Sequence, residues 1–422
     1  MSDTLQLTSL CNKSSVPVSK RPQLVYVLTE LTPGAKLASM RMPLNFCLVL
    51  DRSGSMSGEK LRTMKAAVKS LIDQLDPDDM LSIITFETHT EDLLPAQRAT
   101  DKAELKRLVD DIRDGGGTEM APALQAGLQQ VSTHNAPGRI SRIVMLTDGE
   151  ATDTEDHSRQ AADQAGEMNV PIIGLGFGDE WNEEFLQDLA DRSMLSEPGS
   201  EVGYIDYIST PSRADTIFQQ AYQHMQVTAQ NVHVNIRMVQ GLEARRVWQL
   251  TPMIKDITRS SVQSRAISIP VGDLDRSGLT LMAELSLPPR PEGLTQIAQS
   301  DVVYEVPGHG KQREAVDLVI NFSNDPAQLA QVDGKVMSVV ERVRAHKLST
   351  IALRDAEAGK VGAATKKLTQ AVTILLGQGQ NEEAAELEKV AEQLEASGEV
   401  TSEVKKTIKL TGRKTQRLAP AA

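Results

Sequence analysis

The sequence predicts an α/β protein: a doubly wound, Rossmann-like domain inserted in or followed by an antiparallel β-sandwich, with a C-terminal helical segment. Three observations lead to this prediction. Apolar runs alternate with helical patterns over residues 43–228, period-two alternation replaces them over 229–322, and residues 323–400 are rich in Ala, Leu, Glu and Lys. Strands joined by crossover helices require a parallel sheet with helices on both faces.

Composition and charge argue against several classes of protein. With 422 residues, 40% hydrophobic and 24% charged, the chain fits two or three globular domains. The formal net charge of −12 argues against a general nucleic-acid or anionic-membrane partner, since both favour a basic surface. There is no signal-peptide pattern, and no apolar run approaches the ~20 residues of a membrane span. Cys11 and Cys47 suggest no disulfide framework, so a cytoplasmic protein is expected.

The doubly wound domain is predicted over residues 43–228. It begins with a continuous apolar run at 44–50, typical of a central strand buried on both faces, and a helix follows that ends before Pro77. Further strands are expected at 80–86, 91–94 (a short edge strand), 142–147, 171–177 and 202–205. Further helices are expected at 105–112, 121–131, 161–168, 183–189 and in a long segment ending at 228. Such folds place their sites at the carboxyl ends of the strands.

The β-sandwich is predicted over residues 229–322, where apolar and polar residues alternate between Gly and Pro turns. Its strands are expected at 232–236, 266–271, 279–287, 302–306 and 315–322. The N-terminal segment 1–42 also has a β pattern, at 24–28. We expect this segment to pair with the later strands, which would make the doubly wound domain an insertion in the β-domain.

The C-terminal region 323–400 predicts helices at 329–353, 360–376 and 382–396, because apolar residues recur there with a spacing of three or four. Residues 401–422 are predicted to be a flexible basic tail, since lysines and arginines occur from Lys405 onward without an acidic residue.

Oxygen-bearing side chains follow the first buried strand. Asp51, Ser53 and Ser55 alternate along the loop, and Gly54 permits the tight turn that lets their oxygens converge. Ser57 is then a natural N-cap for the next helix. One carboxylate and two hydroxyls are hard ligands that suit Mg²⁺ or Mn²⁺ and not Zn²⁺.

Two further sequences carry the same kind of ligand. Thr118 follows three glycines at the start of a predicted helix, and Asp148 follows the 142–147 strand in a Thr-Asp-Gly sequence. Each is interpreted, taken alone, as a helix cap or a turn. Their joint occurrence at strand ends favours a shared metal site. By contrast, Asp153 and Glu155 are interpreted as helix-start residues, because Thr152-x-x-Glu155 fits a capping box.

These three sequences, in this order, are similar to the metal-ion-dependent adhesion site of von Willebrand A domains. The resemblance covers residues 43–228 and implies parallel strands with one antiparallel edge. It also implies that a Mg²⁺ or Mn²⁺ ion is held directly or through water by five residues: Asp51, Ser53, Ser55, Thr118 and Asp148. A remaining coordination position would take an Asp or Glu carboxylate from a protein partner.

The expected function is therefore binding, by an intracellular metal-dependent adaptor. The order of the domains resembles bacterial relatives of inter-α-trypsin-inhibitor heavy chains and calcium-activated-channel-type A-domain proteins. The alternative is a regulatory subunit of an ATPase or a Ser/Thr-kinase signalling system, with Thr411 or Thr415 phosphorylated.

An enzyme is not expected. Ser57 and Lys60 match a Ser-x-x-Lys pair, but the other sequences that accompany that pair in β-lactamases are missing. A metal-dependent phosphatase would need a base aimed at a metal-bound water. His89, His134 and His157 are interpreted instead as solvated surface residues.

Overall fold

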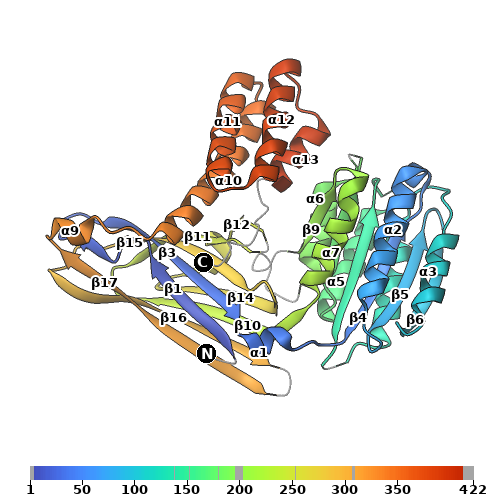
Figure 1. The fold of residues 1–422 in the computed structure, drawn as a ribbon, viewed down its shortest axis with the longest axis horizontal. Coiled ribbons are helices and arrows are strands. Elements are labelled where there is room, and N and C mark those ends of the chain that lie inside the picture. Colours follow the sequence, from blue (N-terminus) through green and yellow to red (C-terminus); the bar gives the residue numbers. More distant parts are fainter. Residues whose placement is uncertain are drawn as a thin grey trace. The chain divides into compact units, whose positions relative to one another are not determined.

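The computed structural model describes residues 4–136, 138–151, 153–178, 180–194, 203–251, 253–306 and 309–411. The chain forms two compact units (Figure 1). One is Met40–Thr228, and the other combines Met1–Ser39 with Ala229–Ala422. The chain thus starts in the second unit, leaves it to build the first, and returns.

The unit Met40–Thr228 is built on a six-stranded sheet with the order β6-β5-β4-β7-β8-β9. The strands are β4 (Leu44–Asp51), β5 (Met80–Phe86), β6 (Thr90–Arg98), β7 (Ile140–Thr147), β8 (Ile172–Phe177) and β9 (Ile205–Ile208). All neighbours are parallel except β5 and β6, so the predicted antiparallel edge strand is confirmed, and it is longer than expected. The last strand begins at Ile205 and not at 202, a residue that lies outside the described part of the chain.

Helices cover both faces of this sheet (Figure 1). They are α2 (Glu59–Gln74), α3 (Lys102–Asp111), α4 (Met120–Ser132), α5 (Glu155–Glu167), α6 (Glu183–Arg192) and α7 (Ala214–His224). Alternate residues of β4 pack against the helices on opposite faces of the sheet. Leu48 belongs to the cluster that contains the α2 residue Val68, whereas Val49 faces Gly127 of α4. The predicted helix ending at 228 stops at His224, because Val227 already begins strand β10.

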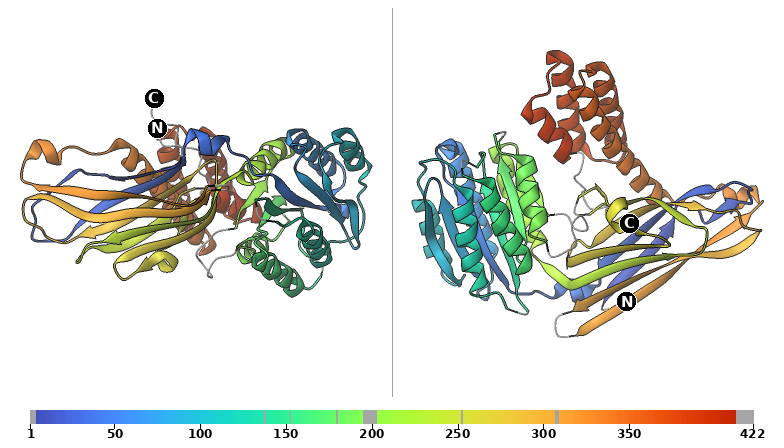
Figure 2. Two further views of the ribbon diagram at one scale, coloured as in Figure 1. Left: turned by 90° about the horizontal axis from the view of Figure 1, so that it is seen from below. Right: turned by 180° about the vertical axis from the view of Figure 1, so that it is seen from behind.

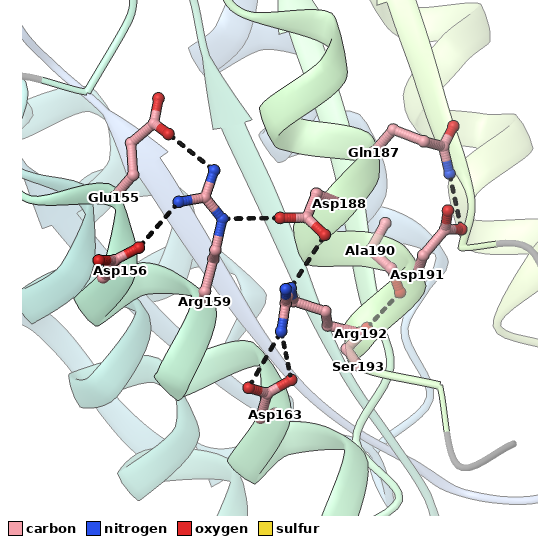
Figure 3. A network of polar contacts seen from close by, with 10 residues as sticks. All are labelled: Glu155, Asp156, Arg159, Asp163, Gln187, Asp188, Ala190, Asp191, Arg192 and Ser193. Carbon is pink, nitrogen blue, oxygen red and sulfur yellow. Dashed lines mark hydrogen bonds and ion pairs between the residues drawn. The ribbon is translucent and has the colours of Figure 1, made fainter. Parts of the chain in front are cut away.

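Ion pairs join α5 to α6 on the surface (Figure 3). Arg159 reaches Glu155, Asp156 and Asp188, and Arg192 reaches Asp188 as well as Asp163 of α5. The pKa of Arg159 is raised, chiefly by its hydrogen bond to Asp188. Because water and salt screen this exposed network, we assign it to helix orientation and not to stability.

The second unit contains two β-sheets (Figure 2). One has the order β1-β3-β15-β11-β12: β1 (Leu5–Cys11), β3 (Gln23–Pro33), β15 (Leu279–Leu287), β11 (Glu243–Gln249) and β12 (Lys255–Asp256). The other is β13-β14-β10-β16-β17-β2: β13 (Val262–Gln263), β14 (Ala266–Asp275), β10 (Val227–Met238), β16 (Gly293–Val306), β17 (Gly310–Ser323) and β2 (Ser15–Pro17). Ser9 of β1 and Ser300 of β16 share a 3.0 Å hydrogen bond that links the two sheets.

The N-terminal strands belong to this sandwich, as predicted. Strand β3 lies between β1 and β15 and pairs with both in antiparallel register. The short strand β2 instead pairs with β17 in parallel, so the sandwich is not wholly antiparallel. Both sheets therefore combine strands that precede the inserted domain with strands that follow it.

The C-terminal helices are α10 (Gly334–Glu357), α11 (Val361–Gly377), α12 (Asn381–Ser397) and α13 (Ser402–Thr411), after the short α9 (Pro326–Leu329). The predicted helix 329–353 is therefore divided, because Asp333 caps a new helix by accepting from the Val336 N–H at 2.9 Å. The predicted tail is wrong for residues 402–411: Val404 and Ile408 are buried in the helical core. Within the described residues, no helix is long and apolar enough to cross a membrane.

Candidate metal-binding site

Asp51, the last residue of β4, has no exposed surface. Its Oδ1 accepts a 2.8 Å hydrogen bond from the Ser53 N–H, which turns the loop back over the strand. Its Oδ2 accepts a 2.7 Å hydrogen bond from the hydroxyl of Thr147, at the end of β7. The carboxylate therefore joins the carboxyl ends of two neighbouring parallel strands.

The two loop serines connect Asp51 to the second aspartate. The hydroxyls of Ser53 and Ser55 lie 3.0 Å apart, and Ser55 donates to Oδ1 of Asp148 at 2.6 Å. Asp148 directly follows β7 and is as fully buried as Asp51. Four of the five predicted ligands thus form one hydrogen-bonded cluster.

Thr118 reaches the same edge through a loop that docks on the β4 loop. The Gly115 N–H donates to the Arg52 carbonyl at 2.9 Å, and the Gly54 N–H donates to the Gly116 carbonyl at 3.2 Å. The Thr118 hydroxyl lies close to Gly149, the residue after Asp148, since it is 3.6 Å from the position that a Cβ would take at this glycine. Glu119, and not Thr118, occupies the N-cap of α4.

The interpretation of Asp153 as a start of α5 is wrong. Its carboxylate accepts from the N–H groups of Met120 and Ala121, at 3.1 and 2.8 Å, so it caps α4 across a chain reversal. Glu155 does begin α5, whereas Thr152 lies outside the described residues. The Ser57 prediction is wrong as well, because Gly58 is the N-cap of α2.

Replacing Asp153 with alanine should lower the free energy of unfolding by about 1 kcal/mol, the usual cost of losing a helix cap. Asp153→Asn should lose less stability than the alanine variant, because its single amide oxygen can still accept from one of the two α4 N–H groups, each of which donates to a different carboxylate oxygen of Asp153. Urea unfolding of the two variants and the native chain measures this. Equal losses in both variants would show that charge, and not capping, is the contribution of Asp153.

The site carries more negative than positive charge. Burial raises the pKa of Asp51, and the nearby charge of Asp148 adds to this effect, against hydrogen bonds from Ser53 and Thr147 that lower it. In the part of the chain that the structure describes, the cationic group that contacts Asp148 is Lys60 of α2, whose ammonium meets Oδ2 of this aspartate. Sequence reasoning missed this role, although a lysine in the first turn of a helix opposes the helix dipole and is itself a signal.

The donor set fits a hard divalent cation. Two carboxylates and one ammonium leave a formal charge of −1 in a buried cluster that also offers three neutral hydroxyls. Among the described residues, no group of three or more His, Cys, Asp or Glu side chains is placed to hold a metal ion. His89, His134 and His157 are exposed, as expected.

Comparison with known proteins identifies the family. Residues 45–220 match the von Willebrand factor type A domain, and residues 334–418 match the Sll0103-like C-terminal alpha-helical domain. The chain is 30% identical over 346 residues to the sll0103 protein of Synechocystis, a match that covers 79% of each chain. The chain belongs to the von Willebrand factor type A family. The predicted resemblance to von Willebrand A domains is confirmed.

Other relatives of this VWA protein share less of it. Inter-alpha-trypsin inhibitor heavy chain H3 of Mesocricetus auratus is 32% identical over 160 residues, which is 35% of this chain and 18% of that protein. A von Willebrand factor type A structure from Catenulispora acidiphila covers 99% of this chain and 98% of its own, with a TM-score of 0.74 at 19% identity. That structural match confirms the fold of the whole VWA chain, including the β-sheets and the helical end.

VWA domains commonly bind a divalent metal and mediate protein–protein contacts. In this chain, the residues predicted as ligands are those that the fold gathers at the carboxyl edge of the sheet.

Proposed function

We propose that this VWA protein is a metal-dependent protein-binding adaptor. A Mg²⁺ or Mn²⁺ ion held by Asp51, Ser53, Ser55, Thr118 and Asp148 binds an Asp or Glu carboxylate of a protein partner. One observation carries the proposal: two fully buried carboxylates lie at the ends of neighbouring parallel strands, linked through serine hydroxyls, with the ammonium of Lys60 as counter-charge. A hard dication supplies the missing positive charge and accepts an external oxygen ligand.

The proposed chemistry is binding and not catalysis. The side chain of His89 is 83% exposed and lies beside Glu87. The ammonium of Lys60 is paired with Asp148 and so is no free base. Without a base that activates a metal-bound water, a hydrolytic step has no support.

We propose a cytoplasmic setting on the basis of the cysteines. Cys11 and Cys47 are both free thiols, and burial raises the pKa of each to about 12. Such thiols are inert, and their presence fits a reducing compartment.

The structure does not favour the regulatory-subunit alternative at Thr411. This residue is only 5% exposed, and its hydroxyl donates to the Glu386 carboxylate at 2.6 Å. A phosphate on Thr411 would be repelled by that carboxylate and would require α13 to leave the helical core. Thr415 lies outside the described residues.

Calorimetric titration of the full chain with Mn²⁺ and Mg²⁺ tests the proposal. We expect one ion to bind per chain, and we expect a short Gly-Asp-Gly peptide with blocked ends to bind only when the ion is present. EDTA should abolish peptide binding, and a Gly-Asn-Gly peptide should not bind, because it has no charged oxygen. Absence of metal uptake, even with the acidic peptide in excess, would refute the proposal.

A further inference from the structure

Lys60 lies at the metal site without being one of the five proposed ligands. Its ammonium contacts Oδ2 of Asp148, while Oδ1 of the same carboxylate accepts the hydroxyl proton of Ser55. Both oxygens of Asp148 therefore already have a partner within the chain. A cation that binds Asp148 must share this carboxylate with the lysine.

The position of Lys60 is set by the fold and is open to solvent. Its Nζ and Cε lie 3.5 Å from the place that a Cβ would take at Gly178, so the end of the side chain rests against the loop after β8. The lysine side chain is 29% exposed, whereas that of Asp148 is fully buried. The ammonium can thus meet a group that arrives from solvent.

The charge of Lys60 decides whether the site has a net positive charge when a divalent cation is bound. With Asp51 and Asp148 ionised and Lys60 protonated, the formal charge is −1 − 1 + 1 = −1, and a divalent cation brings it to +1. Without the lysine, the loaded site would be neutral. An incoming carboxylate therefore meets a net positive charge only because Lys60 is present.

We propose that Lys60 adds to the coupling between cation binding and carboxylate binding. The cation competes with the ammonium for Asp148, which weakens metal uptake by the free protein. The ammonium that the cation releases pairs with the partner's carboxylate, which strengthens capture only when the cation is bound. The coupling is reciprocal, so the acidic partner raises metal affinity by the same factor as the metal raises partner affinity. This inference rests on the proposed function and assigns a specificity role to a residue outside the ligand set.

Replacing Lys60 with methionine removes the charge but keeps a long apolar side chain. We expect Lys60→Met to bind Mn²⁺ more tightly than the native chain when no peptide is present. We also expect saturating Gly-Asp-Gly peptide to increase its Mn²⁺ affinity by a smaller factor. Coupling factors of this kind are typically between about 5- and 150-fold, and the variant should lose the part of the coupling that the ammonium supplies. Calorimetric Mn²⁺ titrations of the native chain and of the variant, each with and without peptide, give the four Mn²⁺ affinities.

Lys69→Met is the matched control. Lys69 lies on the same helix and pairs with Asp110 on the exposed surface, so the variant has the same net charge without a change at the site. Lys69→Met should keep the native coupling between Mn²⁺ binding and peptide binding. Lys60→Arg, which retains the charge, should also retain a large part of this coupling.

Each outcome is decisive. Native coupling in Lys60→Met overturns this inference and leaves the proposed function standing, whereas failure of the native chain to take up Mn²⁺ removes the proposed function first. Equal loss in the Met and Arg variants also overturns the inference, since size and not charge would then be responsible. If the Met variant fails to fold, the native chain still decides: coupling that does not weaken as KCl is raised excludes a charge effect at this partly exposed lysine.

Discussion

Asparagine at position 51 is expected to weaken Mn²⁺ binding by at least about 100-fold, which corresponds to roughly 2.7 kcal/mol. The change removes one of two buried charges at the proposed site but keeps the shape of the side chain. The asparagine oxygen still accepts from the Ser53 N–H, and its amide group can donate to the Thr147 hydroxyl. Calorimetric titration with Mn²⁺ measures the loss, and binding of the Gly-Asp-Gly peptide should disappear with it.

The same variant should not be less stable than the native chain when EDTA is present. Burial raises the pKa of Asp51, which means that its ionised form is disfavoured in the metal-free fold. A neutral amide avoids that cost, so urea unfolding in EDTA should give a free energy equal to or above the native value. A functional site held at the expense of stability has this signature.

Asp79→Asn is the matched control for this prediction. Asp79 is also fully buried, but it lies at the amino end of β5, where it accepts from the Leu44 N–H at 2.8 Å and pairs with Arg41. We expect the control to lose stability and to keep its Mn²⁺ affinity, the reverse of Asp51→Asn. Native Mn²⁺ affinity in Asp51→Asn would contradict the assignment of Asp51 as a ligand.

Gly278→Ala is expected to destabilise the β-domain by about 3 kcal/mol. Gly278 forms the turn between β14 and β15 with φ of +76°, and an added Cβ would lie 2.2 Å from the carbonyl oxygen of Leu31. That oxygen belongs to the backbone of β3, which is paired with β15 beside it. The clash cannot be relieved by a side-chain rotation, so the sheet itself must shift.

Gly310→Ala separates the clash from the backbone conformation. Gly310 has φ of +68° at the start of β17, and a Cβ there would meet nothing within 4 Å. This variant should lose only about 1 kcal/mol, the cost of a left-handed non-glycine residue. Urea unfolding followed by the fluorescence of Trp248, in a Trp181→Phe background, measures both in the β-domain. Equal losses would show that contact with β3 does not matter.

Some local patterns were sufficient to predict function-bearing elements. The unbroken apolar run of β4 and the alternation of strands with helices indicated a buried parallel sheet, because burial on both faces demands that composition. The ends of parallel strands lie at one edge, so Asp51 and Asp148 could be placed near each other without coordinates. The pairing of β3 with later strands was predicted from the β pattern at residues 24–28 of the N-terminal segment.

Some contacts could not be predicted in this way, because the residues that make them belong to no periodic pattern in the sequence. Asp153 lies next to α5 in the chain, yet it caps α4, because unpaired N–H groups at a helix start donate to any acceptor that lies nearby in space. Helix α13 was taken for a tail because basic residues occur from Lys405 onward without an acidic residue, yet Val404 and Ile408 are buried in the helical core.

The order of the chain's own residues thus determined the fold class, the division into an inserted domain and its host, and the five oxygen-bearing side chains at the sheet edge. Only the tertiary structure decided that Lys60 shares the carboxylate of Asp148, 88 residues away. Secondary structure follows from periodic burial, which a sequence displays directly. A contact between two charges depends on where separate loops meet, and that is set by the packing of the whole domain.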